Sequence, residues 1–166
     1  MSDFDYSKRI LSRDEMIAER ARLRAESKTV CFTNGCFDIL HTGHLQYLTF
    51  ARRQGDCLVV GLNSDASVRR NKGDKRPIVS EHDRALMLTA LRPVDYVVIF
   101  EDDEPRDLIT AILPDVLIKG RDWAHYVSGR DVVEAHGGRV VLADLVEGRS
   151  TSNIIVAIEA GEKTCG

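Results

Sequence analysis

The chain has 166 residues, of which 43% are hydrophobic and 30% charged, and its formal net charge is −3. This length and composition are typical of one globular domain with its own core. The negative charge argues against bulk nucleic acid or an acidic membrane as the main partner, and no apolar stretch approaches the ~20 residues of a membrane span. The polar start MSDFDYSKR does not resemble a signal peptide, and Cys31, Cys36, Cys57 and Cys165 lack the spacing of a disulfide framework. We therefore expect a cytoplasmic protein with reduced thiols.

Hydrophobic periodicity predicts helices and strands in alternation. Residues 13–26 are rich in helix formers, so residues 1–27 are expected to form an N-terminal helical extension before a main domain at 28–166. Strands are expected at 29–34, 57–63, 95–100, 115–120 and 139–144. Further helices are expected at 44–55, 81–92, 105–113, 128–138 and 150–160. The polar and basic stretch 64–77 is predicted to be mostly loop.

Short apolar strands that alternate with helices predict an α/β fold: a doubly wound, Rossmann-like, parallel five-stranded sheet. In such folds, ligands bind beyond the carboxyl ends of the strands. This rule selects the loops 34–43, 63–77, 100–105, 119–127 and 145–150.

The first of these loops contains the stretch TNGCFDILHTGH, residues 33–44. A glycine after a strand lets the backbone approach a ligand, and the first N–H groups of a helix are unpaired donors with a partial positive charge. His41 and His44 are spaced to share one helix face, where both rings can donate to phosphate oxygens. Phosphate binding therefore accounts for both histidines together with Gly35 and Gly43.

Two other readings of the histidine pair remain open. The pair alone is equally compatible with ordinary surface or core histidines at a helix start. A zinc site would use Cys36, Asp38, His41 and His44, but its spacing differs from the His-x-x-x-His of zinc helices, and no further Cys/His pair lies nearby. The P-loop and Gly-x-Gly-x-x-Gly patterns are absent.

The motif GCFD (35–38) followed by HTGH (41–44) resembles the signature of the cytidylyltransferase-like nucleotidyltransferases. EHDR (81–84), KGRDW (119–123) and EGRSTSN (147–153) are similar to further segments of that family, in the same order. The resemblance spans about residues 28–160 and is strongest to the heptose 1-phosphate adenylyltransferase branch. In many bacteria that domain is fused to a sugar kinase, and we expect here the stand-alone form.

The resemblance implies that a phosphate oxygen of a sugar phosphate attacks the α-phosphorus of ATP and that pyrophosphate leaves. A phosphate monoester is already largely dianionic at neutral pH, so the chain must mainly position and neutralise two polyanions. The implied catalytic residues are His41, His44 and Lys72. The implied nucleotide-binding residues are Asn34, Gly35, Cys36, Phe37, Gly43, Arg84, Gly120, Glu147, Arg149, Ser150 and Thr151. The implied acceptor-binding residues are Asp38, Lys75, Lys119, Asp122 and Trp123.

The implied cofactor is Mg²⁺, bound through substrate phosphates and water rather than directly by the protein. Asp38 is left between metal support and loop bracing, and Ser150 and Thr151 are also candidates to cap the last helix. The loop reads Leu-Val-Glu-Gly where the glycerol phosphate branch has Arg-Thr-Glu-Gly, and Arg149 is the candidate replacement for the missing arginine.

Two rival functions remain from the sequence alone. One keeps the chemistry but uses CTP with glycerol 3-phosphate or another polyol phosphate. The other is a regulatory nucleotide-binding module without turnover. Either way we expect small-molecule substrates, no nucleic acid or membrane partner, and a homodimer, since related nucleotidyltransferases are commonly dimeric. Apolar residues of the N-terminal segment, Met16 and Ile17 among them, could cover the sheet or a partner subunit.

Overall fold

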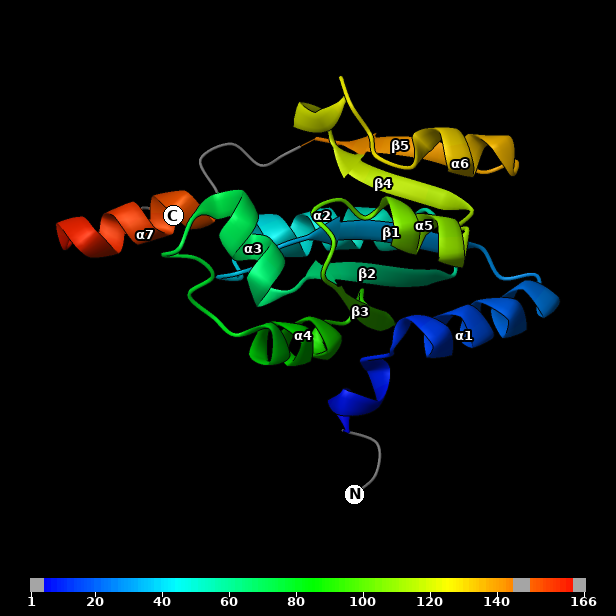
Figure 1. Cartoon of the computed structure of the whole chain (residues 1–166), viewed down its shortest axis with the longest axis horizontal. Coiled ribbons are helices and arrows are strands. Elements are labelled where there is room, and N and C mark those ends of the chain that lie inside the picture. The colour runs from blue at the N-terminus through cyan, green and yellow to red at the C-terminus, as the bar shows by residue number, and fades with distance from the viewer. Residues whose placement is uncertain (1–4, 145–149, 163–166) are drawn as a thin grey trace.

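The computed structural model describes residues 5–144 and 150–162 (Figure 1). The strands are β1 (Val30–Gly35), β2 (Cys57–Asn63), β3 (Tyr96–Phe100), β4 (Val116–Gly120) and β5 (Arg139–Ala143). The α-helices are α1 (Arg13–Ala25), α2 (Thr42–Arg52), α3 (Asp65–Lys72), α4 (Glu81–Ala90), α5 (Arg106–Ile112), α6 (Arg130–Ala135) and α7 (Thr151–Ala160). Two 3-10 helices, η1 (Tyr6–Arg9) and η2 (Arg121–Trp123), complete the described elements.

The strands form one sheet in the order β3-β2-β1-β4-β5, and every pair is parallel. This confirms the predicted doubly wound α/β fold. Strands β2 and β3 lie on one side of β1, whereas β4 and β5 lie on its other side. The direction in which strands are added to the sheet therefore reverses between β1 and β4. The loops that follow these two strands therefore diverge and leave a crevice between them.

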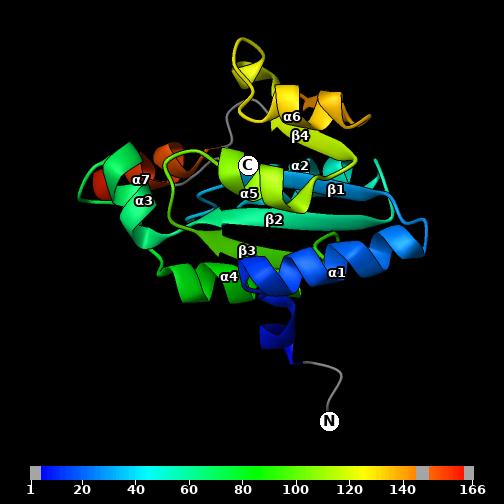
Figure 2. The same ribbon diagram turned by 45° about the vertical axis from the view of Figure 1, so that its right-hand side comes forward.

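Side chains of successive strand residues point to opposite faces, which divides the core in two. Val30 and Phe32 of β1 pack beneath α1, α5 and α6, whereas Cys31 packs beneath α2 and α4. Figure 2 shows α1 and α5 in front of the sheet with α2 behind it. Met16 of α1 is completely buried in the first of these clusters, so α1 covers the chain's own sheet.

The prediction that residues 64–77 are mostly loop is wrong, because Asp65–Lys72 form helix α3. Ser64 caps this helix, since its hydroxyl accepts a hydrogen bond from the backbone N–H of Ser67 at 3.1 Å. Basic residues fill the last turn, where they complement the helix dipole, and Val68 is completely buried. The polar and basic composition of residues 64–77 indicated a loop. The N-cap at Ser64 and the buried side chain of Val68 nevertheless stabilise a short helix there.

The predicted helix at 128–138 is also too long, since α6 covers only Arg130–Ala135. Gly137 follows with a φ of 82°, a conformation that favours glycine, and ends the helical path. Among the described residues, no helix is long and apolar enough to cross a membrane.

Candidate active site

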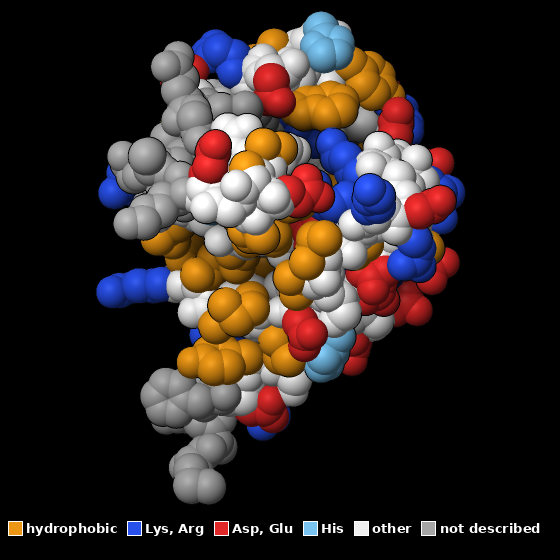
Figure 3. Space-filling model, turned by 90° about the vertical axis from the view of Figure 1, so that its left-hand side faces the viewer, with side chains coloured by type: hydrophobic (Ala, Val, Ile, Leu, Met, Phe, Trp, Pro, Cys, Tyr) orange, Lys and Arg blue, Asp and Glu red, His pale blue; other side chains and the backbone are white. Residues whose placement is uncertain are grey.

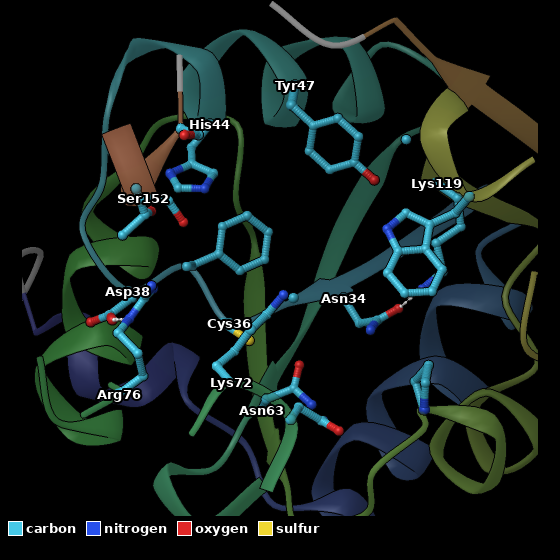
Figure 4. A pocket seen from close by; sticks show the side chains of 18 of the residues that line it. Asn34, Cys36, Asp38, His44, Tyr47, Asn63, Lys72, Arg76, Lys119 and Ser152 are labelled. Carbon is cyan, nitrogen blue, oxygen red and sulfur yellow. Dashed lines mark hydrogen bonds and ion pairs between the residues drawn. The ribbon is translucent and has the colours of Figure 1, made fainter. Parts of the chain in front are cut away.

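A cavity of about 750 Å³ opens at the carboxyl ends of the strands, over the crevice between β1 and β4. Its size is typical of small-molecule sites. Its walls come from the ends of β1, β2 and β4, from the starts of α2 and α7, and from the last turn of α3. In Figure 4, His44 and Ser152 lie on one side of this cavity, and Asn34 and Lys119 lie on the other.

A sharp turn after β1 brings the two histidines into the cavity. Phe37 has a φ of 45°, which is uncommon for a residue with a side chain, and its ring is buried against the ring of His44. His41 is the N-cap residue of α2, and His44 lies in the first turn. The rings of His41 and His44 stack with centroids 3.9 Å apart, so the predicted juxtaposition of the pair is present.

Burial of His44, together with the charge of His41, lowers the pKa of His44 to about 4. The ring is therefore neutral at neutral pH, and one of its nitrogens carries a hydrogen. Its Nδ1 is buried, and no hydrogen-bond partner for this atom lies in the part of the chain that the structure describes. A bound polyanion at this place would reverse the balance and favour the imidazolium.

Asp38 braces the loops that form this end of the cavity. Its completely buried carboxylate accepts hydrogen bonds from the backbone N–H groups of Ile78 and Val79, both at 2.9 Å, and an ion pair from Arg76 at 2.5 Å. Burial alone would raise the pKa of Asp38, but these donors outweigh it and hold the pKa below its usual value. In the free protein these contacts make Asp38 a brace between the two loops, and its role toward a ligand or metal stays a prediction.

Arg84 is buried and joins three segments beneath the site. Its guanidinium donates to the carbonyls of Val79 and Cys36, at 2.9 and 2.5 Å, and to the carboxylate of Asp65 at 2.7 Å. Its side chain has no exposed surface and does not line the cavity. In the free protein, Arg84 therefore supports the loop rather than presenting its charge to a ligand.

Lys119 lies at the end of β4, where its ammonium group donates a hydrogen bond to the side-chain oxygen of Asn34 at the end of β1. Burial lowers the pKa of Lys119 to about 8, although the charges of Glu104 and Asp122 oppose that shift. The lysine thus places a titratable cation in the crevice at the point where the strand order reverses.

Helix α7 brings its first turn to the same cavity. Ser150 caps it by accepting from the N–H of Asn153 at 3.1 Å, and Thr151 donates to the carbonyl of Ile39 at 3.3 Å. The cap predicted for this helix is confirmed at Ser150. Glu147 and Arg149, both expected to contact nucleotide, lie outside the described residues.

Most of the predicted site residues line one cavity. These are Asn34, Gly35, Cys36, Phe37, Asp38, His41, Gly43, His44, Lys72, Lys119, Gly120, Trp123, Ser150 and Thr151. Lys75 and Asp122 do not line it, although the charge of Asp122 is near enough to raise the pKa of Lys119. The roles assigned to these residues stay predictions.

Several residues of the cavity were missed by sequence reasoning. These are Tyr47, Asn63, Asn71, Arg76, Asp103, Glu104, Pro105, Tyr126, Ser128 and Ser152. Asn63 and Glu104 lie in loops that the strand-end rule had already selected, so closer attention to those loops would have found them. Tyr47 gave no signal: its hydroxyl contacts Thr33 and Ile118, which only the packing of α2 on the sheet brings together.

The described residues contain no group of three or more His, Cys, Asp or Glu side chains that could hold a metal ion. The donors around the histidines are instead ring and ammonium N–H groups, which suit phosphate oxygens.

Comparison with protein-family models matches residues 32–158 to the family described as Cytidylyltransferase-like. The chain belongs to the cytidylyltransferase-like family. The resemblance carried by residues 35–38 and 41–44 is thereby confirmed. Because the match extends from β1 into α7, it includes every strand of the sheet and every wall of the cavity.

The chain is 57% identical over 147 residues to "Bifunctional protein HldE" of Syntrophotalea carbinolica, which corresponds to 88% of this chain and 29% of that protein. It therefore spans about three tenths of the length of this curated relative. A solved lipopolysaccharide core biosynthesis protein from Thermoplasma volcanium superposes with a TM-score of 0.58 at 28% identity, covering 72% of this chain and 97% of that chain. Pantothenate synthetase from Thermus thermophilus, at 20% identity and a TM-score of 0.60, covers 92% of this chain and 69% of its own, and shares the fold alone.

The half-buried His44 of this cytidylyltransferase-like chain should make its stability depend on pH. His44 titrates near 4 when folded and near its usual 6.5 when unfolded, so between these values the unfolded state binds more protons. The free energy of unfolding should therefore fall as pH drops through this window, by up to roughly 3 kcal/mol. Urea denaturation of the wild type and of His44→Asn between pH 7.5 and 4.5 measures the effect, and the variant should lose this part of the pH dependence. The exposed His82→Asn variant is the control, and an equal pH slope in all three proteins would contradict the assignment.

Proposed function

We propose that this chain is a nucleotidyltransferase that condenses ATP with D-glycero-D-manno-heptose 1-phosphate, yielding ADP-heptose and pyrophosphate for lipopolysaccharide core synthesis. The observation that carries the proposal is the stacked pair His41 and His44 at the start of α2, in one cavity with Lys72 and Lys119. The relative named HldE and the lipopolysaccharide core biosynthesis protein support the choice of acceptor. A cytoplasmic location fits these soluble substrates.

The chemistry needs positioning and charge neutralisation more than proton transfer. A phosphate oxygen of the acceptor forms a bond to the α-phosphorus, while the bond from that phosphorus to the bridging oxygen breaks and pyrophosphate leaves. Because the acceptor phosphate is already largely dianionic, no general base is required. His41 and His44 would donate to the triphosphate and to the α-phosphoryl group as charge develops, and Lys72 would approach from the end of α3.

Mg²⁺ fits the site as part of the substrate complex. The described residues offer no cluster of three carboxylate, thiolate or imidazole ligands for it, whereas Mg²⁺ is commonly held through substrate phosphates and water. When bound, it supplies further neutralisation of the triphosphate charge. The chain's own part is to orient the phosphates with Gly43, the histidines and the lysines.

The substrates can be tested by measuring pyrophosphate release from ATP, CTP, GTP and UTP, each combined with heptose 1-phosphate, glycerol 3-phosphate or other sugar phosphates. We expect the highest kcat/KM for ATP with heptose 1-phosphate. Highest turnover with CTP and glycerol 3-phosphate would favour the cytidylyltransferase alternative. Nucleotide binding without release from any pair would favour a regulatory module.

Substitution of the histidine tests its proposed role. His44→Ala should lower kcat/KM by about 10²-fold or more, because it removes a donor whose contact strengthens in the transition state. His82→Ala, an exposed histidine away from the cavity, is the matched control and should retain activity. Unchanged kcat/KM in a His44→Ala protein with a normal melting curve would exclude the donor role.

We also propose that the chain forms a homodimer through α7. None of the residues of this helix is buried, and Val156 and Ile158 are 62% and 68% exposed. Figure 3 shows apolar side chains exposed across the face on which α7 lies. Burial of such surface against a second copy would be favourable, and a two-fold dimer is the commonest closed assembly.

Light scattering at micromolar concentration tests the assembly. The wild type should give twice the chain mass of 18.6 kDa, and Ile158→Lys, which places a charge on the exposed apolar face, should shift the mass toward one chain. Glu159→Lys changes charge at the neighbouring position and serves as the control. A wild-type mass near one chain would refute the dimer.

A further inference from the structure

The wall of the cavity formed by the segment after β4 carries aromatic side chains. Trp123 and Tyr126 line it and are 52% and 51% exposed. Trp123 stacks on His125, with ring centroids 6.2 Å apart and planes 17° apart, so its ring has a neighbour on one side. Large rings exposed at the mouth of a polar cavity offer flat apolar faces with polar edges, which is a surface suited to a ligand with both characters.

Glu104 lies in the same wall, just before α5, and its carboxylate is held in place. One oxygen, Oε2, accepts hydrogen bonds from the hydroxyl of Tyr126 at 2.8 Å and from the hydroxyl of Ser128 at 2.9 Å. No donor among the described residues hydrogen-bonds to the other oxygen, Oε1. A fixed carboxylate with an available oxygen is a strong acceptor for ligand hydroxyl groups.

The charges of the cavity differ from one end to the other. The histidine end contributes the ring N–H groups of His41 and His44 and the ion pair of Arg76 with Asp38, whereas Glu104 contributes negative charge and Lys119 positive charge at the other end. Lys72 lies between the two ends in Figure 4. The charge of Glu104 also acts on Lys119, which lies across the cavity from His44 in Figure 4. Lys119 attracts a phosphate group and Glu104 repels it. Uncharged hydroxyl groups can instead donate hydrogen bonds to the carboxylate of Glu104.

We propose that Glu104, Tyr126 and Trp123 form the subsite for the hydroxyl-bearing carbon skeleton of a phosphorylated sugar, with its phosphate directed to Lys119. This rests on the proposed function for the identity of the acceptor. It adds a direction of binding: the hydroxyls lie toward the start of α5, the sugar face lies against the aromatic rings, and the phosphate points to the nucleotide. A site that hydrogen-bonds substrate hydroxyls discriminates against analogues that lack them, so Glu104 is a specificity-determining residue.

The chain contains a single tryptophan, so its tryptophan emission, excited at a wavelength that tyrosine does not absorb, reports on this wall. The protein, saturated with a non-hydrolysable ATP analogue and Mg²⁺, is titrated with heptose 1-phosphate and, separately, with inorganic phosphate. We expect saturable change in emission with the sugar phosphate and none with inorganic phosphate. Because this measures binding, it does not depend on turnover, and absence of pyrophosphate release would overturn the proposed function while leaving the subsite measurable.

Glu104→Gln should raise the Kd for the sugar phosphate by about tenfold or more, because the charged acceptor is lost. The Kd for the ATP analogue, measured by calorimetry, should stay unchanged. Asp107→Asn removes the same charge on α5 outside the cavity and should bind both ligands as the wild type does. Melting curves establish that the variants fold.

Three results would overturn the inference. One is a wild-type protein whose emission does not respond to the sugar phosphate. Another is a Glu104→Gln protein that binds the sugar phosphate normally, which would make Glu104 only a brace for Tyr126 and Ser128. The third is weaker binding of the ATP analogue with unchanged sugar phosphate binding, which would assign this wall to the nucleotide.

Discussion

The buried carboxylate of Asp38 joins the two loops on which the site depends. It belongs to the turn after β1, and its three donors belong to the segment between α3 and α4. The same carboxylate therefore holds the histidine loop against the residues that follow Lys72. Leaving such a charge buried without partners costs about 3–5 kcal/mol. The segment that follows α3 is thus restrained before any ligand arrives.

Arg84 extends this restraint into the core. It reaches the carbonyls of Cys36 and Val79 and the carboxylate of Asp65, which belong to the ends of the same two loops and to the start of α3. The arginine thereby satisfies backbone groups that the sharp turns leave without partners in a sheet or helix. The loops that carry the cavity's donors are thus fixed in place before a substrate binds. Donors that are fixed in advance need little reorganisation when charge develops on a substrate, and this preorganisation is the main source of electrostatic stabilisation in enzymes.

The parts of this arrangement that depend on local sequence were predictable. The continuous apolar run Val30, Cys31 and Phe32 indicated a strand buried on both faces, and the spacing of His41 and His44 placed both rings on one side of a helix start. The strand-end rule then selected the loops that surround the cavity. These inferences succeed because they use only the periods of strand and helix and the position of a turn.

The parts that depend on partners distant in the chain were not predictable in the same way. Arg84 was expected to contact nucleotide, but an arginine at a helix start has the same sequence appearance whether it faces a ligand or Asp65. Glu104 lies in the loop 100–105 that the strand-end rule selected, but nothing in the sequence singles it out within that loop, because only the fold brings Tyr126 and Ser128 to its carboxylate. Tertiary contacts determine which residue pairs with a charged side chain, so the local sequence does not reveal that partner.

The neutral state of His44 connects this packing to the chemistry of the site. Its pKa of about 4 follows from partial burial and from the nearby His41, so the imidazole of His44 is uncharged in the free cavity at neutral pH. A triphosphate placed beside the ring would favour protonation, and the favourable charge would then exist only in the complex and increase as negative charge develops. Because desolvation disfavours the imidazolium of His44 in the free protein, the ring becomes charged only beside a ligand of high negative charge. The attraction between His44 and the ligand is therefore strongest where the negative charge on the ligand is greatest. Burial lowers the pKa of Lys119 as well, but only to about 8, so this lysine is mostly charged at neutral pH and provides positive charge across the cavity before any ligand binds.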